Sequence, residues 1–133
     1  GQLDWRLRND PRVVVMERCN IRHLDAETIP EPIALGVIDV SFISLKLVLP
    51  CVIKFLAAQA WVIALVKPQF EAGIKQVGRG GIVRDEAVRA AVIDKVEGIA
   101  KNLGFACLGH LDSPVMGKRG NREMLLGLRW SPR

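Results

Sequence analysis

The order of apolar segments in the sequence predicts an α/β fold with a mostly parallel sheet. Two runs, 33–40 and 60–66, are almost continuously apolar, which is typical of parallel strands covered on both faces. Helix-spaced apolar residues separate them, as a crossover between parallel strands requires. Two later runs, 105–111 and 124–130, are joined by a connection too short for a helical crossover. We therefore expect the last strand to be antiparallel to its neighbour.

The strands predicted in chain order differ in how they begin and end. A β-branched run at 12–17 predicts a first buried strand. The run 33–40 is interrupted only by Asp39, and the run 60–66 stops at Lys67, which a proline follows. The two final runs complete the predicted sheet.

Two segments have the apolar spacing of amphipathic helices. The first covers residues 44–58, with Ser44 as its predicted N-cap and Pro50 as a site of bending. The second begins after Asp85 and ends at Gly104, which is the residue type that most often terminates a helix. Strands alternating with helices favour a single domain over residues 1–133.

Composition excludes several classes of protein. The chain has 133 residues, a formal net charge of +5, half of its residues apolar, and 3 cysteines. A chain of this length can bury one hydrophobic core, and its apolar content is too high for a disordered chain. Three cysteines do not build a disulfide framework, so we expect free thiols in a reducing compartment. The longest apolar stretch is broken by Pro50, Lys54 and Gln59, which argues against a membrane-spanning helix. Because the sequence begins with Gly1 and not with Met, we expect this chain to be a piece of a longer protein.

Three charged residues follow or precede the predicted strands at one edge of the sheet. Asp39 lies near the end of one parallel strand, Lys67 directly follows the next, and Glu123 precedes the antiparallel last strand. Ligands and catalytic groups gather at the carboxyl ends of parallel strands. A carboxylate within an apolar run also needs a cation or a donor near it. We expect these three residues to converge and to carry the chemistry.

Two glycine-containing loops are basic and are expected at the same edge. Their cations predict a polyanionic partner such as RNA. The residues concerned are Lys75, Arg79, Arg84, Lys118, Arg119 and Arg122. Gly78–Gly81 lacks the spacing of a phosphate-binding Walker loop. His23 and His110 lack the spacing of metal ligands, so no metal site is predicted.

Several blocks of the sequence resemble one family, in order along essentially the whole chain. They are Val37-Ile-Asp-Val-Ser-Phe-Ile-Ser-Leu45, Ala64-Leu-Val-Lys-Pro-Gln-Phe-Glu-Ala-Gly73, Val77-Gly-Arg-Gly-Gly-Ile-Val-Arg84, and parts of the segments 1–8, 17–20 and 117–126. They are similar to the hemolysin A (TlyA) family, which groups with FtsJ-like methyltransferases that depend on S-adenosylmethionine. The resemblance implies a Rossmann-like methyltransferase fold and 2′-O-methylation of ribose in ribosomal RNA, in the cytoplasm.

The resemblance also implies roles for individual residues. FtsJ-like enzymes use a Lys-Asp-Lys-Glu tetrad, of which Asp39, Lys67 and Glu123 match the last three members. The first Lys, the glycine-rich cofactor loop and an S4-type RNA-binding domain are expected upstream of Gly1, so the methyltransferase domain is expected to be incomplete at its N-terminal side. The residues left for contact with S-adenosylmethionine are Asn20, Ile21, Asp39, Val40 and Ser41.

The expected mechanism gives Lys67 the central role. A ribose 2′-hydroxyl is a weak nucleophile, so Lys67 is expected to accept or polarise its proton, with Asp39 and Glu123 orienting the amine. A Lys accepts a proton only where a cation or desolvation depresses its pKa. Because the first Lys of the tetrad has no match in this chain, we expect the 133 residues alone to be inactive.

Two other functions compete with this interpretation. One is an RNA-binding module without catalysis, in which only the basic loops matter. The other is a membrane-acting hemolysin, as the family name suggests. The sequence argues against the second, since neither predicted helix has a Lys- and Arg-rich face opposite aromatic residues. Calorimetric binding of S-adenosylmethionine separates the first from an enzyme, and liposome leakage tests the second.

Overall fold

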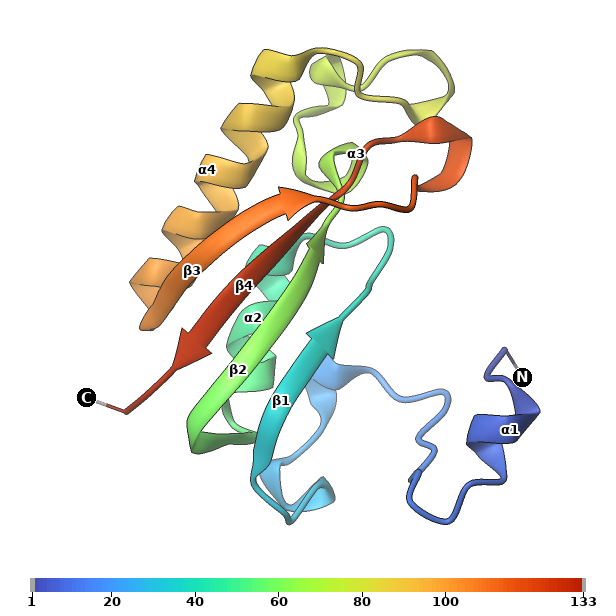
Figure 1. Ribbon diagram of the computed structural model, residues 1–133, viewed down its shortest axis with the longest axis vertical. Helices are drawn as coiled ribbons and strands as arrows, with labels where there is room; N and C mark the ends of the chain where they lie inside the picture. Colours follow the sequence, from blue (N-terminus) through green and yellow to red (C-terminus); the bar gives the residue numbers. More distant parts are fainter. Residues whose placement is uncertain (1, 133) are drawn as a thin grey trace.

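The computed structural model describes residues 2–132, apart from the side chain of Lys118, and centres on a four-stranded sheet (Figure 1). Its strands are β1 (Ile33–Ile38), β2 (Leu56–Val66), β3 (Phe105–Asp112) and β4 (Met124–Trp130). The spatial order is β1-β2-β4-β3, with β1 and β2 parallel and β4 antiparallel to both of its neighbours. Three strands therefore run in one direction. The predicted mostly parallel sheet with an antiparallel last strand is confirmed.

Helices connect the strands where the apolar spacing predicts them, except that the helix predicted over 44–58 ends at Ile53 and residues 56–58 belong to β2. The α-helices are α1 (Trp5–Arg8), α2 (Leu45–Ile53), α3 (Pro68–Glu71) and α4 (Glu86–Leu103), and the 3₁₀ turns are η1 (Ile21–His23), η2 (Ala26–Thr28), η3 (Ile74–Gln76), η4 (Arg79–Gly81) and η5 (Lys118–Gly120). Ser44 caps α2 by accepting a hydrogen bond from the Lys46 amide at 3.1 Å. Asp85 caps α4 in the same way, and Gly104 ends it at a positive φ of 110°. The predicted caps are confirmed.

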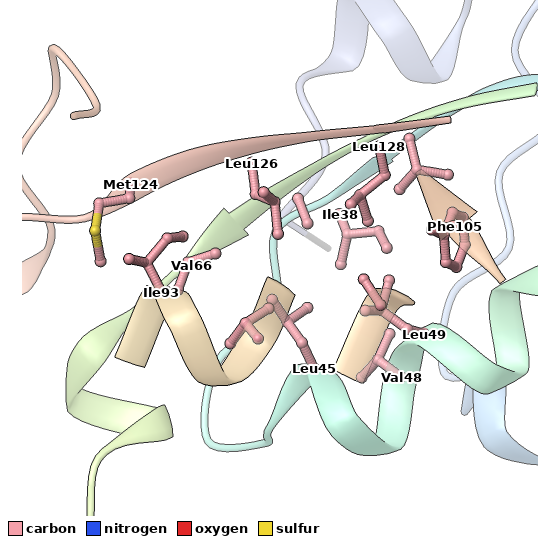
Figure 2. Packing of buried hydrophobic residues seen from close by; sticks show 14 of the residues in the cluster. Ile38, Leu45, Val48, Leu49, Val66, Ile93, Phe105, Met124, Leu126 and Leu128 are labelled. Atoms are coloured by element: carbon pink, nitrogen blue, oxygen red, sulfur yellow. The ribbon is translucent and has the colours of Figure 1, made fainter. Parts of the chain in front are cut away.

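The core lies between one face of the sheet and the two long helices (Figure 2). Leu45, Val48 and Leu49 of α2 and Ile93 of α4 pack against the strands. The strand residues on this face belong to all four strands: Ile38, Val62, Ala64, Val66, Phe105, Met124, Leu126 and Leu128. Burial of these side chains supplies the main stabilising term of the fold.

Among residues 2–132, nothing covers the opposite face of the sheet, so the expected cover on both faces of the parallel strands is not found in the described part of the chain. Leu35 and Val37 of β1 are 54% and 71% exposed, and Trp61 of β2 is 48% exposed. Successive residues of a strand point to opposite faces, so these side chains point away from α2 and α4. Continuous apolar character indicates the capacity for burial on both faces, and the described residues cover one of them.

The prediction of a strand at 12–17 is also wrong. These residues form no strand, and Val14 is almost fully exposed. A β-branched run forms a strand only when a neighbouring strand pairs with it. In Figure 1 the segment around α1 lies apart from the sheet, so no such partner is present among the described residues.

Candidate functional site

The first pair of predicted catalytic residues meets at the carboxyl ends of β1 and β2. The two strands are parallel, with Ile38 in register with Ala64, so Asp39 and Lys67 leave the sheet at the same edge. The Nζ atom of Lys67 lies 2.6 Å from Oδ1 of Asp39 and donates a hydrogen bond to Oγ of Ser41 at 3.0 Å. The Lys67 side chain is 12% exposed and that of Asp39 is 65% exposed. The ammonium group is therefore fixed by two oxygens beneath a carboxylate that faces solvent.

Glu123 lies at the same edge but makes a different contact. Met124, the first residue of β4, pairs with Val66, the last residue of β2. Glu123 precedes Met124 and Lys67 follows Val66, so both residues lie at the same end of this antiparallel pair. Its side chain is buried, and its Oε2 accepts a hydrogen bond from Nε2 of Gln69 at 2.8 Å. No ion pair joins Glu123 to Lys67 among residues 2–132. The structure thus brings Asp39 and Lys67 together, with Glu123 beside them and held by another residue.

Two residues that the sequence analysis did not single out hold this edge together. Gln69 donates a hydrogen bond to Glu123, and its own Oε1 is buried without a hydrogen-bond partner among residues 2–132. Glu71 is buried and accepts hydrogen bonds from Oγ of Ser44 at 2.8 Å and from the Leu45 amide at 2.7 Å. Its carboxylate therefore sits at the N-terminus of α2, where helices favour a negative charge. Both residues lie in the block 64–73, and the resemblance of that block to the family was the sequence signal that could have identified them.

The residues predicted to contact a cofactor gather around a hollow beside β1. Asn20, Ile21, Val40 and Ser41 line a cavity of about 490 Å³ together with Ile43 and Val48. Asp39 lines a neighbouring cavity, also of about 490 Å³, that shares Ile21 and Val40. Asn20 caps η1 by accepting a hydrogen bond from the Arg22 amide at 3.0 Å. The hollow thus combines apolar walls with an amide and a hydroxyl, and it adjoins Lys67 through Ser41.

The two basic loops lie against each other. Nη1 of Arg119 donates a hydrogen bond to the Gly80 carbonyl at 2.5 Å, and Asn121 contacts Gly81 and Val83. A cavity of about 260 Å³ opens between the loops and the aromatic pair Phe42 and Phe70, whose ring centroids are 4.8 Å apart. Gln69 also lines this cavity and donates a hydrogen bond to Glu123, so the cavity lies next to Glu123.

The predicted RNA-binding cations differ in their surroundings. Lys75, Arg79 and Arg84 have no acidic partner among the residues that the structure describes. Arg122 instead pairs with Glu86 at 2.8 Å and with Asp112 at 3.3 Å. The side chain of Lys118 lies outside what the structure describes. Arg119 also has no acidic partner among the described residues, so Lys75, Arg79, Arg84 and Arg119 keep charge for a partner.

A buried arginine joins the helix α4 to this edge. Arg89 is 4% exposed, and its guanidinium contacts Glu86 at 2.7 Å, Asp112 at 2.9 Å and the Arg122 carbonyl at 3.2 Å. The hydrogen bond from Arg89, helped by Arg122, lowers the pKa of the Asp112 carboxyl below its ordinary value. This network fixes the backbone that leads into Glu123.

Neither a metal-binding cluster nor a membrane-spanning helix is found in the part of the chain that the structure describes. Within residues 2–132, no group of three His, Cys, Asp or Glu side chains is arranged to hold a metal ion. No helix in the described part of the chain has the length and apolar character needed to cross a membrane.

Comparisons with known proteins agree with one another. Residues 1–130 match the family described as FtsJ-like methyltransferase. The chain is 49% identical over 129 residues to the 16S/23S rRNA (cytidine-2′-O)-methyltransferase TlyA of Mycobacterium tuberculosis, covering 97% of this chain and 48% of that protein. It is 36% identical over 126 residues to Hemolysin A of Brachyspira hyodysenteriae, covering 94% of this chain and 52% of that protein.

A solved structure gives the same result for the fold. A protein described as a candidate hemolysin from Streptococcus thermophilus superposes with a TM-score of 0.93 at 44% identity, covering 98% of this chain and 47% of the other. The chain spans about half the length of the curated relatives that it matches.

Proposed function

The chain belongs to the FtsJ-like methyltransferase family, and from this premise we propose that the protein containing it transfers a methyl group from S-adenosylmethionine to ribose 2′-hydroxyls of ribosomal RNA. The observation that carries the proposal is the Lys67–Asp39 pair and its surroundings. Lys67 contacts Ser41, which lines the hollow beside β1, and Glu123 contacts Gln69, which lines the cavity between the basic loops. A cofactor pocket and an RNA surface on either side of a reactive edge are what methyl transfer to RNA requires.

The hollow beside β1 fits part of S-adenosylmethionine. When bound, this cofactor supplies an electrophilic methyl group on a sulfonium. Ile21 and Val40 offer apolar contacts for an adenine ring, and Asn20, Ser41 and Asp39 offer polar ones. This chain contains no G-x-G-x-x-G pattern. We propose that the glycine-rich loop, the first tetrad Lys and an S4-type RNA-binding domain belong to the rest of the protein.

Lys67 is the residue that acts on the ribose hydroxyl. Its Nζ is held by Asp39 and Ser41, so the amine keeps one position at the edge of the sheet. There a neutral amine would accept the hydroxyl proton, and the charge of the first tetrad Lys, in the rest of the protein, would favour that neutral form. Alignment of the reacting atoms contributes a further part of the rate. Glu123 acts from the other side, positioned by Gln69.

The basic loops supply the RNA surface. Lys75, Arg79 and Arg84 neutralise phosphate charge, and Arg119 lies where both loops meet. Phe42 and Phe70 offer aromatic faces in the same cavity, a combination that suits unstacked bases of single-stranded RNA. A ribosomal RNA substrate also implies a cytoplasmic protein.

A rate measurement with one substitution tests the proposal. The full-length protein is incubated with purified ribosomal subunits and tritiated S-adenosylmethionine, beside its Lys67→Ala and Lys101→Ala variants. We expect Lys67→Ala to lower the rate by about 1,000-fold while keeping the thermal midpoint, because the acid–base group is lost. Lys101, an exposed residue of α4, serves as the matched control. Equal rates for all three proteins, or no transfer by the unsubstituted protein, contradict the proposal.

Calorimetry separates this function from non-catalytic RNA binding. An enzyme binds S-adenosylmethionine in the absence of RNA, and a passive RNA-binding module does not. We expect binding by the full-length protein and weaker binding after Val40→Asp, which puts a charge into the apolar wall of the hollow.

A further inference from the structure

We infer that Asn121 is a positioning residue for RNA binding, which sets the glycine-rich loop 78–84 against the loop 117–122. The inference rests on the proposed function and deepens it. In the sequence Asn121 stands out only as part of the block 117–126, because its role depends on contacts with residues about 40 positions away.

The side chain of Asn121 uses both ends of its amide on the other loop. It is 3% exposed. Its Oδ1 accepts a hydrogen bond from the Val83 amide at 3.0 Å, and its Nδ2 donates one to the Gly81 carbonyl at 2.9 Å. An amide side chain has a donor and an acceptor side by side, so it can satisfy a backbone N–H and a backbone C=O at once.

The loop that Asn121 holds is costly to order. Gly80 and Gly81 both adopt positive φ, at 75° and 77°, a conformation that other residues rarely take. Glycine also has the most conformational freedom to lose, so the loop needs contacts from outside to keep one shape. Arg119 supplies another contact through Gly80, but Arg119 is exposed and Asn121 is buried. Asn121 is therefore the stronger fixed point.

The same residue faces the catalytic edge through its backbone. The Asn121 carbonyl accepts a hydrogen bond from the Gly117 amide at 2.7 Å, which closes the loop 117–121. Gly117 in turn packs against the carboxylate of Glu123. Asn121 thus connects the loop that carries Arg79 and Arg84 to the turn that rests on Glu123. Cations held in place before RNA arrives lose less conformational freedom on binding, which improves affinity.

The test compares two variants in the full-length protein with ribosomal subunits as substrate. Asn121→Asp keeps the shape but sets an acceptor against the Gly81 carbonyl, and Asn121→Ser removes the contact without adding charge. We expect both to raise KM for RNA by about tenfold, the effect of one or two lost hydrogen bonds, with kcat changed by about twofold at most. The dissociation constant for S-adenosylmethionine stays unchanged. A fall in kcat with KM unchanged overturns the inference.

A second arm separates positioning from general damage to the fold. Arg79→Ala alone raises KM because a phosphate contact is lost. If Asn121 acts by positioning the cations of this loop, Asn121→Asp adds little further increase in the Arg79→Ala background. Fully additive effects on KM overturn the inference. If the unsubstituted protein transfers no methyl group, the proposed function fails and not this inference. The contact is then tested directly by exchange of the Val83 amide hydrogen with deuterium. Unchanged protection of that amide in Asn121→Ser overturns the inference.

Discussion

Asp39 and Glu123 are carboxylates at the same edge of the sheet, and the structure holds them in opposite ways. Asp39 is largely exposed, and its ion-pair partner is Lys67. Glu123 is buried, contacts Gln69, and lies under the Gly117 turn. The difference teaches which substitutions separate chemistry from folding. Changes at Asp39 should affect mainly the reaction, and changes around Glu123 should act through the packing that surrounds it.

Of the two carboxylates, the exposed one is expected to give the larger effect. Asp39→Asn removes the charge that fixes the position of the Lys67 side chain, so we expect the methyl-transfer rate to fall by about 100-fold. The free energy of unfolding should change by about 1 kcal/mol at most, because Asp39 itself is 65% exposed and Lys67 keeps its hydrogen bond to Ser41. Single-turnover rates and urea unfolding of the full-length protein measure the two quantities. A large loss of stability would erase the contrast with Glu123.

A substitution beside the buried carboxylate should give the next largest effect. The Cβ of an alanine at 117 overlaps the Glu123 carboxylate, so Gly117→Ala must displace that group. We expect the transfer rate to fall by about tenfold, because small displacements at a reacting site are costly. Gly98→Ala is the matched control, since nothing lies within 4 Å of its Cβ. Equal rates for the two variants would show that the position of Glu123 is unimportant.

The contacts between the strand-end loops give a purely structural prediction. Glu71→Gln weakens the charge-assisted hydrogen bonds to Ser44 and Leu45, so we expect the free energy of unfolding to fall by about 1–2 kcal/mol. Glu27→Gln, at an exposed position, should change it little. Chemical denaturation measures both. An unchanged midpoint for Glu71→Gln would mean that these contacts do not hold the loop after β2 to the loop after β1.

The smallest effect is expected on the thermal midpoint at low pH. The pKa of Asp112 is lowered in the folded protein by Arg89, so the stabilisation it brings is present above the ordinary value of 3.8 and is lost as pH falls through the folded value. The thermal midpoint of Asp112→Asn should therefore lie below that of the unsubstituted protein at pH 6. The two should converge only at a pH below the lowered pKa of Asp112, which itself lies below 3.8. A constant difference at both pH values would contradict this assignment.

Local sequence patterns and strand topology predicted much of the fold and one pair of residues in the candidate site. Parallel strands end at one edge, so Asp39 and Lys67 could be expected to meet, and the structure pairs them at 2.6 Å. Ser44 and Gly104 mark helix ends by rules that depend on neighbouring residues alone. The antiparallel last strand followed from the length of its connection.

What escaped prediction depends on contacts between distant parts of the chain. The β-branched run 12–17 has the composition of a strand without a partner to pair with. The exposure of Val37 depends on what covers the sheet, which apolar character does not reveal. Gln69, Glu71 and Asn121 act through residues 26 to 54 positions away. Their roles became visible only in the folded arrangement.

The most direct test of the proposed function is the chemical identity of the methylated product. Ribosomal RNA labelled by the full-length protein is hydrolysed in alkali, which cleaves after every ribose with a free 2′-hydroxyl. We predict that the label remains in an alkali-resistant dinucleotide, and that Lys67→Ala yields none. Label recovered on mononucleotides would place the methyl group on a base, and labelling by Lys67→Ala at the unsubstituted rate would remove Lys67 from the reaction; either result contradicts the account.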